Sequence, residues 1–174
     1  MYAAEWAIVT IAISALAGGC ATARTPTVPP ATPVAKDPAE SVRQAVLAGY
    51  TGMWTDYGHD LTSHNWQHPT VAAYATGQAL LLLEANILSD NHDGVVTEGA
   101  PTLYPVVKTV PGVGPSTAEV VDCANFSAVW KYGATTHTRV EKHPDGWHLI
   151  DANLMLREGR WKVSTLAMGA VGSC

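Results

Sequence analysis

The sequence predicts an α+β domain in which N-terminal helices pack against a curved, mostly antiparallel sheet. In the first half of the domain, apolar residues recur at three- and four-residue steps, which is typical of amphipathic helices. From Val95 onward this pattern gives way to short β-rich and alternating runs separated by turn residues, which is typical of a meander. An order of helices first and strands afterwards indicates the α+β class.

The first helix is predicted to begin at Asp37-Pro38, because aspartate caps a helix and proline is favoured in its first turn. It should cover about 18 residues and carry an aromatic C-terminal half. A polar connection, residues 59–68, follows. Two more helical stretches are predicted at residues 69–75 and 77–91, the second ending at Asp93-Gly94, a good stop signal.

A meander of four to six strands is predicted after the helices, from runs at residues 95–97, 103–110, 117–124, 135–142, 147–157 and 160–171. The sequence His-Pro-Asp-Gly at 143–146 and the pair Glu158-Gly159 supply tight turns between the last three. Within 147–157, alternation places Asp151 and Asn153 on one face and a mostly apolar set on the other. The apolar set is His148, Ile150, Ala152, Leu154 and Leu156.

Composition restricts the class of protein. The chain has 174 residues, 47% of them hydrophobic and 14% charged, which suits one folded domain at residues 39–174 with a real core. Its net charge of −5, without any cluster of Lys or Arg, argues against nucleic acid as a partner.

The N-terminus predicts export. Residues 6–17 are an apolar run too short to span a bilayer comfortably, and Gly18-Gly19-Cys20 follows. This arrangement resembles a bacterial lipoprotein signal, which implies a signal peptide at 1–19 and an acylated Cys20 as the mature N-terminus. Residues 20–38 would then be a proline-rich tether to the membrane. The alternative is ordinary cleavage after Ala17 or Ala23, which would release a soluble secreted protein.

The cysteines follow from the same argument. An odd count in an exported chain usually assigns one thiol a separate role, here Cys20. Cys123 and Cys174 are then left to form one disulfide, which would tie together the ends of the C-terminal sheet. The alternative is a pair of buried free thiols.

Five segments resemble a group of actinobacterial secreted proteins and lipoproteins in the NTF2-like (SnoaL-like) superfamily. The resemblance covers about residues 40–174 and implies a cone: a strongly bent sheet wrapped around the first helix, with a pocket between them. It implies no particular reaction, because such relatives have no established one. The segments are Gly-Tyr-Thr-Gly-Met-Trp at 49–54, Tyr-Ala-Thr-Gly-Gln-Ala-Leu at 74–80, Asp-Gly-Val-Val-Thr-Glu-Gly-Ala-Pro at 93–101, Val-Asp-Cys at 121–123 and Ala-Val-Gly-Ser-Cys at 170–174.

In such a cone, aromatic residues of the first helix and of the segment after it would line the pocket. Asp151 and Asn153 would supply its polar groups, and if the protein is an enzyme, Asp151 is the first choice of general base and Asp56 the second. The alternative is that Asp151 lies on the solvent face and is merely hydrated. The predicted aromatic wall comprises Tyr50, Trp54, Tyr57, Trp66 and Tyr74.

No metal or cofactor is expected. His64 and His68 have the i, i+4 spacing of two ligands on a helix, but Asn65 and Pro69 disfavour a helix there, and no Cys or Glu completes a known pattern. Phosphate-loop, dinucleotide and nucleophile-elbow motifs are missing from the sequence.

Three functional hypotheses result. The first is a non-catalytic cell-envelope lipoprotein, held to the membrane by lipid on Cys20, whose domain binds a small apolar ligand or an envelope protein. The second is a SnoaL-like small-molecule enzyme, such as an isomerase, cyclase or hydratase, with a carboxylate base in the pocket. The third is a structural or interaction module that forms a homodimer.

Overall fold

The computed structural model describes residues 37–63, 66–109 and 116–174, which all belong to one compact unit. The predicted signal peptide, Cys20 and nearly all of the predicted tether lie outside the described residues. No helix in the described ranges is both long enough and apolar enough to cross a membrane. The elements are α1 (Pro38–Ser63), a 3-10 turn η1 (Thr70–Ala73), α2 (Gly77–His92), β1 (Val95–Glu98), β2 (Val106–Thr109), β3 (Thr117–Asn125), β4 (Trp130–Gly133), β5 (Trp147–Arg157) and β6 (Arg160–Met168).

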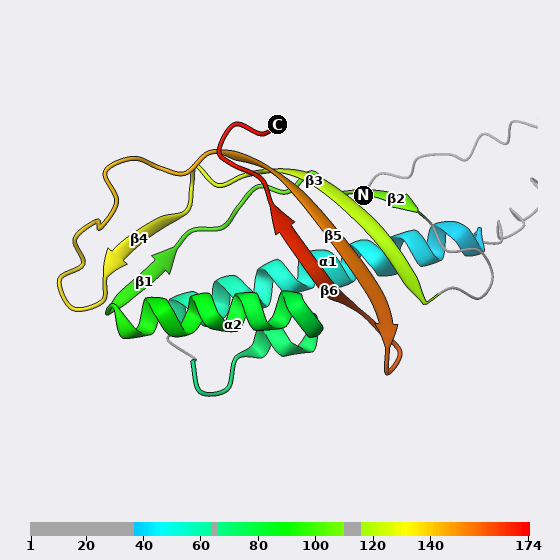
Figure 1. Cartoon of the computed structure of the whole chain (residues 1–174), viewed down its shortest axis with the longest axis horizontal. Helices are drawn as coiled ribbons and strands as arrows, with labels where there is room; N and C mark the ends of the chain where they lie inside the picture. Colours follow the sequence, from blue (N-terminus) through cyan, green and yellow to red (C-terminus); the bar gives the residue numbers. More distant parts are fainter. Residues whose placement is uncertain (1–36, 64–65, 110–115) are drawn as a thin grey trace, which may run out of the picture. The chain divides into compact units, whose positions relative to one another are not determined.

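The strands form two antiparallel sheets (Figure 1). The larger sheet has the order β2-β3-β5-β6, and β3 pairs with β5 along its whole length, from Thr117 opposite Met155 to Asn125 opposite Trp147. The smaller sheet pairs β1 with β4 alone. The predicted α+β class is therefore confirmed, with two helices and antiparallel strands.

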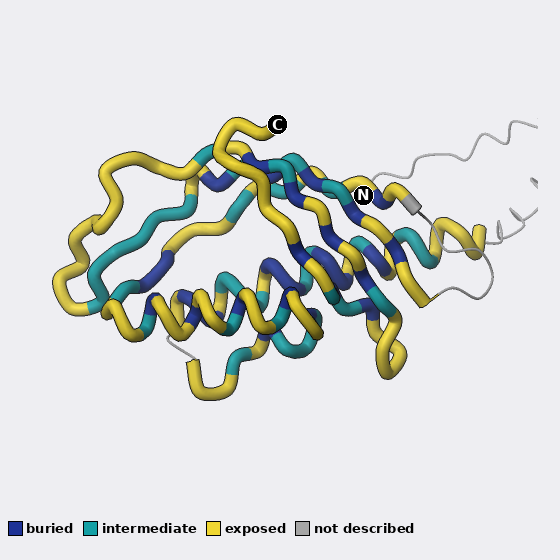
Figure 2. Tube along the Cα trace, viewed as in Figure 1, coloured by how far each residue is buried: buried dark blue, intermediate teal, exposed yellow. Residues whose placement is uncertain are grey.

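Both helices pack against one face of the larger sheet, and α1 runs beneath the arch of β3 and β5 (Figures 1 and 2). The buried face of β5 is the apolar one expected from alternation, except that Leu156 at its end is exposed. Gly49 allows α1 to approach β6 closely, because a Cβ there would lie 2.5 Å from the Trp161 carbonyl oxygen. The completely buried core side chains are Val46, Tyr50, Met53, Val71, Ala79, Val120, Ala124, Ile150, Leu154 and Val163.

Several predicted boundaries are wrong, among them those of the strands predicted at 103–110 and 160–171, which are observed at Val106–Thr109 and Arg160–Met168. The first helix continues through the polar residues 59–63. Asp60, within this last part of the helix, is buried, and its carboxylate accepts hydrogen bonds from the next segment. Residues 135–142 form turns rather than a strand, although their β-branched residues favoured one. The strand in this region is β4, four residues long, and it pairs with β1 rather than with the main sheet.

The disulfide between Cys123 and Cys174 is confirmed, with the two Cα atoms 5.9 Å apart. It attaches the C-terminal segment to β3. Backbone hydrogen bonds from Gly169 N to Leu149 O and from Gly172 N to Trp147 O hold the same segment against β5. The end of the chain is thus fixed beside the start of β5.

Candidate functional site

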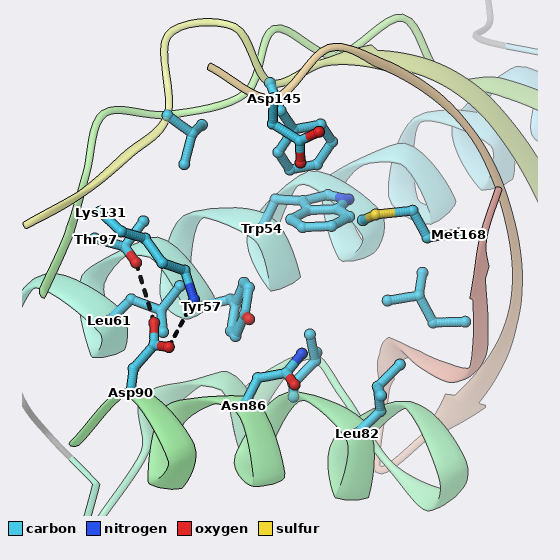
Figure 3. A pocket seen from close by; sticks show the side chains of 14 residues that line it. Trp54, Tyr57, Leu61, Leu82, Asn86, Asp90, Thr97, Lys131, Asp145 and Met168 are labelled. Atoms are coloured by element: carbon cyan, nitrogen blue, oxygen red, sulfur yellow. Dashed lines mark hydrogen bonds and ion pairs between the residues drawn. The ribbon is translucent and has the colours of Figure 1, made fainter. Parts of the chain in front are cut away.

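A cavity of about 430 Å³ lies beside the smaller sheet, between α1, α2, the residues after β3 and the end of β6 (Figure 3). Its lining is mostly apolar, with five polar side chains. The lining residues are Trp54, Tyr57, Leu61, Leu82, Leu83, Asn86, Asp90, Thr97, Phe126, Val129, Lys131, Asp145, Leu166 and Met168. Leu82 and Met168 are 39% and 45% exposed, so this part of the lining forms an apolar rim.

One wall of the cavity is aromatic. Trp54 makes edge-to-face contacts with Tyr57 and Phe126, at ring-centroid distances of 6.0 and 5.5 Å. Aromatic pairs in this geometry add stability beyond their buried area and give a rigid surface. Burial raises the pKa of Tyr57 to about 12, so its hydroxyl is uncharged at neutral pH.

One end of the cavity is polar. The Lys131 ammonium lies 2.6 Å from Asp90 Oδ1, and Thr97 Oγ1 donates to Asp90 Oδ2 at 3.2 Å (Figure 3). Asp90 and Thr97 are both buried. The network joins the end of α2 to both strands of the smaller sheet, because Thr97 lies on β1 and Lys131 on β4. Charge-assisted hydrogen bonds of this kind offset the cost of burying a carboxylate.

A second charged pair borders the cavity at Asp145. The buried His148 ring has an acceptor at each nitrogen: Gly169 O lies 2.8 Å from Nδ1, and Asp145 Oδ1 lies 2.8 Å from Nε2. A neutral imidazole carries one N–H, so donating to both acceptors requires the imidazolium. Burial alone would lower the pKa of His148, but the hydrogen bonds to Gly169 and Asp145 outweigh it and raise that pKa.

The structure separates the predicted aromatic wall. Trp54 and Tyr57 line the cavity, whereas Tyr50 is completely buried and its hydroxyl donates to Asp122 Oδ2 at 3.0 Å. Trp66 and Tyr74 lie at two other surface depressions. Of the five predicted residues, two from α1 therefore lie at this cavity and the other three do not.

Asp151 and Asn153 do not line the cavity. Both are exposed on the face of β5 opposite the helices, which is the hydrated alternative stated above. Asn153 Nδ2 donates to Thr165 Oγ1 of β6 at 2.9 Å. The alternation of β5 was correct, but the face with four small or apolar residues and His148 is the buried one.

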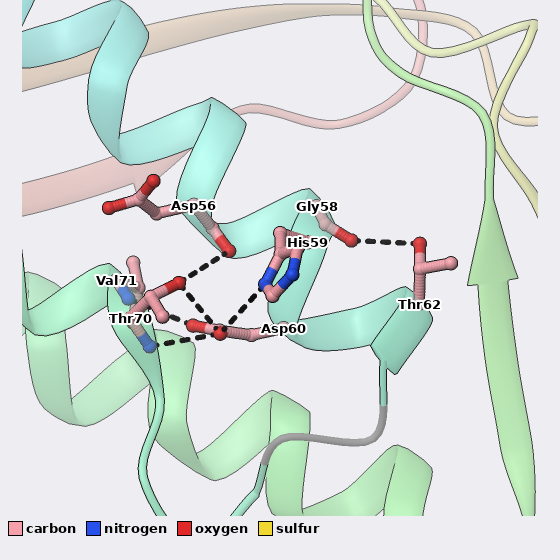
Figure 4. Close-up of polar contacts among 7 residues, drawn as sticks. All are labelled: Asp56, Gly58, His59, Asp60, Thr62, Thr70 and Val71. Carbon is pink, nitrogen blue, oxygen red and sulfur yellow. Dashed lines mark hydrogen bonds and ion pairs between the residues drawn. The ribbon is translucent and has the colours of Figure 1, made fainter.

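Asp56 lies on α1 one turn before Asp60 (Figure 4). It does not line the cavity either. It is half-buried, and burial, then the nearby Asp60 carboxylate, raises the pKa of Asp56. Asp60 itself accepts from Thr70 N, Thr70 Oγ1 and Val71 N at 2.8–2.9 Å, so it has the role of a buried cap that fixes η1 against α1. Of the histidine pair considered for a metal, His64 lies outside the described residues.

Sequence reasoning missed Asn86, Asp90, Lys131 and Asp145. A signal for the first two exists: Leu83, Asn86 and Asp90 share one stripe of α2, so polar residues interrupt an otherwise apolar face. Lys131 and Asp145 gave no such signal, because their segments are irregular or form a very short strand.

No protein-family model matches the chain, and comparison with curated proteins finds no match. Among solved structures, the intermembrane-space region of the chloroplast protein ARC6 is similar, with 12% sequence identity and a TM-score of 0.48. That alignment covers 78% of this chain and 99% of the other.

Proposed function

We propose that this protein is an exported lipoprotein of the cell envelope whose domain binds a small, mainly apolar ligand in the cavity beside Trp54. The observation that carries the proposal is the cavity itself, about 430 Å³ in volume and lined mostly by apolar side chains. Small-molecule sites are typically concave, mostly apolar and about 300–1,000 Å³ in volume, with a few polar groups that orient the ligand.

Export is supported by two features. The sequence at 6–20 resembles a lipoprotein signal, and the domain carries a disulfide, which persists mainly in oxidising compartments. In this proposal Cys20 bears the lipid, and residues 21–38 hold the domain away from the membrane. Intact mass of protein from the native host tests this step: a chain beginning at Gly18 or Arg24 would exclude acylation of Cys20.

We assign the domain to the NTF2-like superfamily as part of the same proposal. The support is the placement of α1 beneath the arched strands β3 and β5, with a cavity lined by its second half (Figure 1). In this assignment the two helices close one side of a cone, and the smaller sheet closes its wide end.

A matched pair of variants tests ligand binding. Leu82 lines the cavity, whereas its neighbour Leu81 is 69% exposed and does not. Leu82→Trp is expected to fill the rim and lower the affinity for an environment-sensitive apolar dye by at least about tenfold. Leu81→Trp adds the same side chain to the same helix and should leave dye affinity unchanged. Titration of dye fluorescence measures both.

Equal dye affinity in the two variants would contradict the proposal, because the dye would then bind elsewhere. If the cavity binds nothing but an envelope protein co-purifies, the protein-binding hypothesis is favoured instead. Chemical conversion of a bound compound during incubation, detected by mass spectrometry, would support the enzyme hypothesis. A dimer that survives dilution in analytical ultracentrifugation would support the interaction module.

A further inference from the structure

The charged side chains that line the cavity are already paired with opposite charges. Lys131 pairs with Asp90 at 2.6 Å, and Asp145 pairs with His148 at 2.8 Å. The remaining lining residues carry no charge, since Tyr57 is protonated at neutral pH. When His148 is protonated, the cavity therefore presents polar groups to a ligand but no net charge.

The polar end of the cavity has donors to spare, while the acceptors of Asp90 are engaged. The Lys131 ammonium has three N–H bonds and directs one at Asp90, and its side chain is 39% exposed. Asp90 uses one oxygen for Lys131 and the other for Thr97. A ligand head group placed here would satisfy Lys131 best by accepting a hydrogen bond.

A charged head group would be disfavoured at the same place. A ligand carboxylate beside Lys131 would also lie close to the Asp90 carboxylate, and a ligand ammonium would be repelled by Lys131 itself. In either case the ligand would bring a charge into a partly buried site without a free partner, which carries a large desolvation cost. An uncharged carbonyl oxygen avoids both penalties.

The polar side chains at one end of the cavity and the apolar side chains at the other set the direction of the ligand. Asp90 and Thr97 are buried, whereas Leu82 and Met168, on the other side of the cavity in Figure 3, are partly exposed. The head group of an amphiphile would thus reach the buried polar end, and its apolar body would extend along Trp54 toward the exposed rim.

Resting on the proposed function of this cavity, we propose that its ligand is an uncharged amphiphile: an apolar chain or ring system that ends in an ester, amide or ketone. The carbonyl oxygen accepts a hydrogen bond from the Lys131 ammonium. The aromatic wall and the leucines of α2 contact the apolar body.

A matched series of probes with one apolar body tests this proposal on the wild-type chain. Methyl decanoate, decanoate and decylammonium share the same chain length and differ in head group. Competition with the apolar dye should show methyl decanoate binding at least about tenfold more tightly than either ion. Decanoate binding as tightly as the ester would overturn the proposal, and so would decylammonium.

The variant Asp90→Asn provides a gain-of-function test. It retains an amide oxygen for Thr97 but leaves the Lys131 charge without its partner. The ratio of decanoate affinity to ester affinity is expected to rise about tenfold. Asp93→Asn is the matched control: it removes the same charge at the end of the same helix, from a side chain that is 61% exposed and does not line the cavity.

An equal change in both variants would contradict the charge argument. If a thermal melt shows that Asp90→Asn is unfolded, the wild-type series decides alone. The head-group assignment alone fails under three joint results. Methyl decanoate competes with the dye, Leu82→Trp abolishes that competition, and decanoate binds as tightly as the ester. If no probe binds and Leu82→Trp has no effect, the proposed function fails as well.

Discussion

The two halves of α1 are packed very differently. The part up to Met53 packs closely against the four-stranded sheet: Val46, Tyr50 and Met53 are completely buried in one core with Ile150 and Leu154. From the next residue onward, Trp54, Tyr57 and Leu61 of the same helix border a cavity of about 430 Å³. One helix therefore supports a close-packed end and a hollow end.

The difference comes from the strands that cover each half. β3, β5 and β6 are 9, 11 and 9 residues long and supply buried side chains to the core beside the part of α1 up to Met53, with β6 lying closest to it. The part from Trp54 onward faces β1, which has four residues and pairs only with the equally short β4. Short strands bring few side chains, so the space remains open. We infer that stability resides mainly at the packed end and ligand binding at the hollow end.

The largest expected effect is therefore a core truncation at the packed end. Leu154→Ala removes a completely buried side chain and should lower the free energy of unfolding by about 2–5 kcal/mol, through lost burial and the space left behind. Leu82→Ala makes the same change at the partly exposed cavity rim and should cost less than about 1 kcal/mol. Urea denaturation of both variants measures the difference, and similar losses would contradict the division into two ends.

The disulfide gives the next largest effect. Cys123 and Cys174 are 51 residues apart, and removing a bridge that closes such a loop typically costs about 2–4 kcal/mol. Cys174→Ser should therefore lower the free energy of unfolding by this amount in chemical denaturation. Ser173→Ala is the control for the C-terminal segment itself, because it removes only the hydrogen bond that Leu149 N donates to Ser173 Oγ. Equal losses in both variants would show that the segment, not the bridge, matters.

The packed end could be predicted from the sequence because its signals are local and periodic. The start of α1, the span of α2, the alternation of β5 and the Asp93-Gly94 stop all follow from residue spacing, and the structure agrees with them. The disulfide followed from counting cysteines. Long elements with one buried face carry their own pattern, so tertiary packing seldom overrides it.

The hollow end could not be predicted in the same way. β4 is too short to show alternation. The Thr-rich residues 135–142 had the composition of a strand but form turns. Lys131 and Asp90 are 41 positions apart and meet only through the fold. Asp151 was also wrongly predicted to lie at the pocket. The structure places it on the exposed face of β5, and which face of β5 is buried depends on where the helices lie.

The smallest expected effect is a pH dependence where the two ends meet. The folded protein raises the pKa of His148 above its ordinary value of 6.5, because Gly169 and Asp145 both accept from the ring. A raised pKa means that this stabilisation is fully present below pH 6.5 and is lost as the pH rises through the folded value. Deprotonation removes one of the two hydrogen bonds, which is worth about 1 kcal/mol.

Comparison of variants isolates this contribution from other titrating groups. The neighbours of the His148 ring include uncharged groups, Ala124 from β3 and the Phe126 ring, so Asp145 is the titratable group that faces it. The free energy of unfolding, measured by urea denaturation from pH 5.5 to 9, should fall more steeply in wild type than in His148→Gln. His92→Gln, whose side chain is 86% exposed, should follow wild type. If His148→Gln also follows wild type, the imidazolium does not hold Asp145 and Gly169 together. Asp145 would then present an unneutralised carboxylate to the cavity. Of the two ion pairs, only that between Lys131 and Asp90 would still support an uncharged ligand.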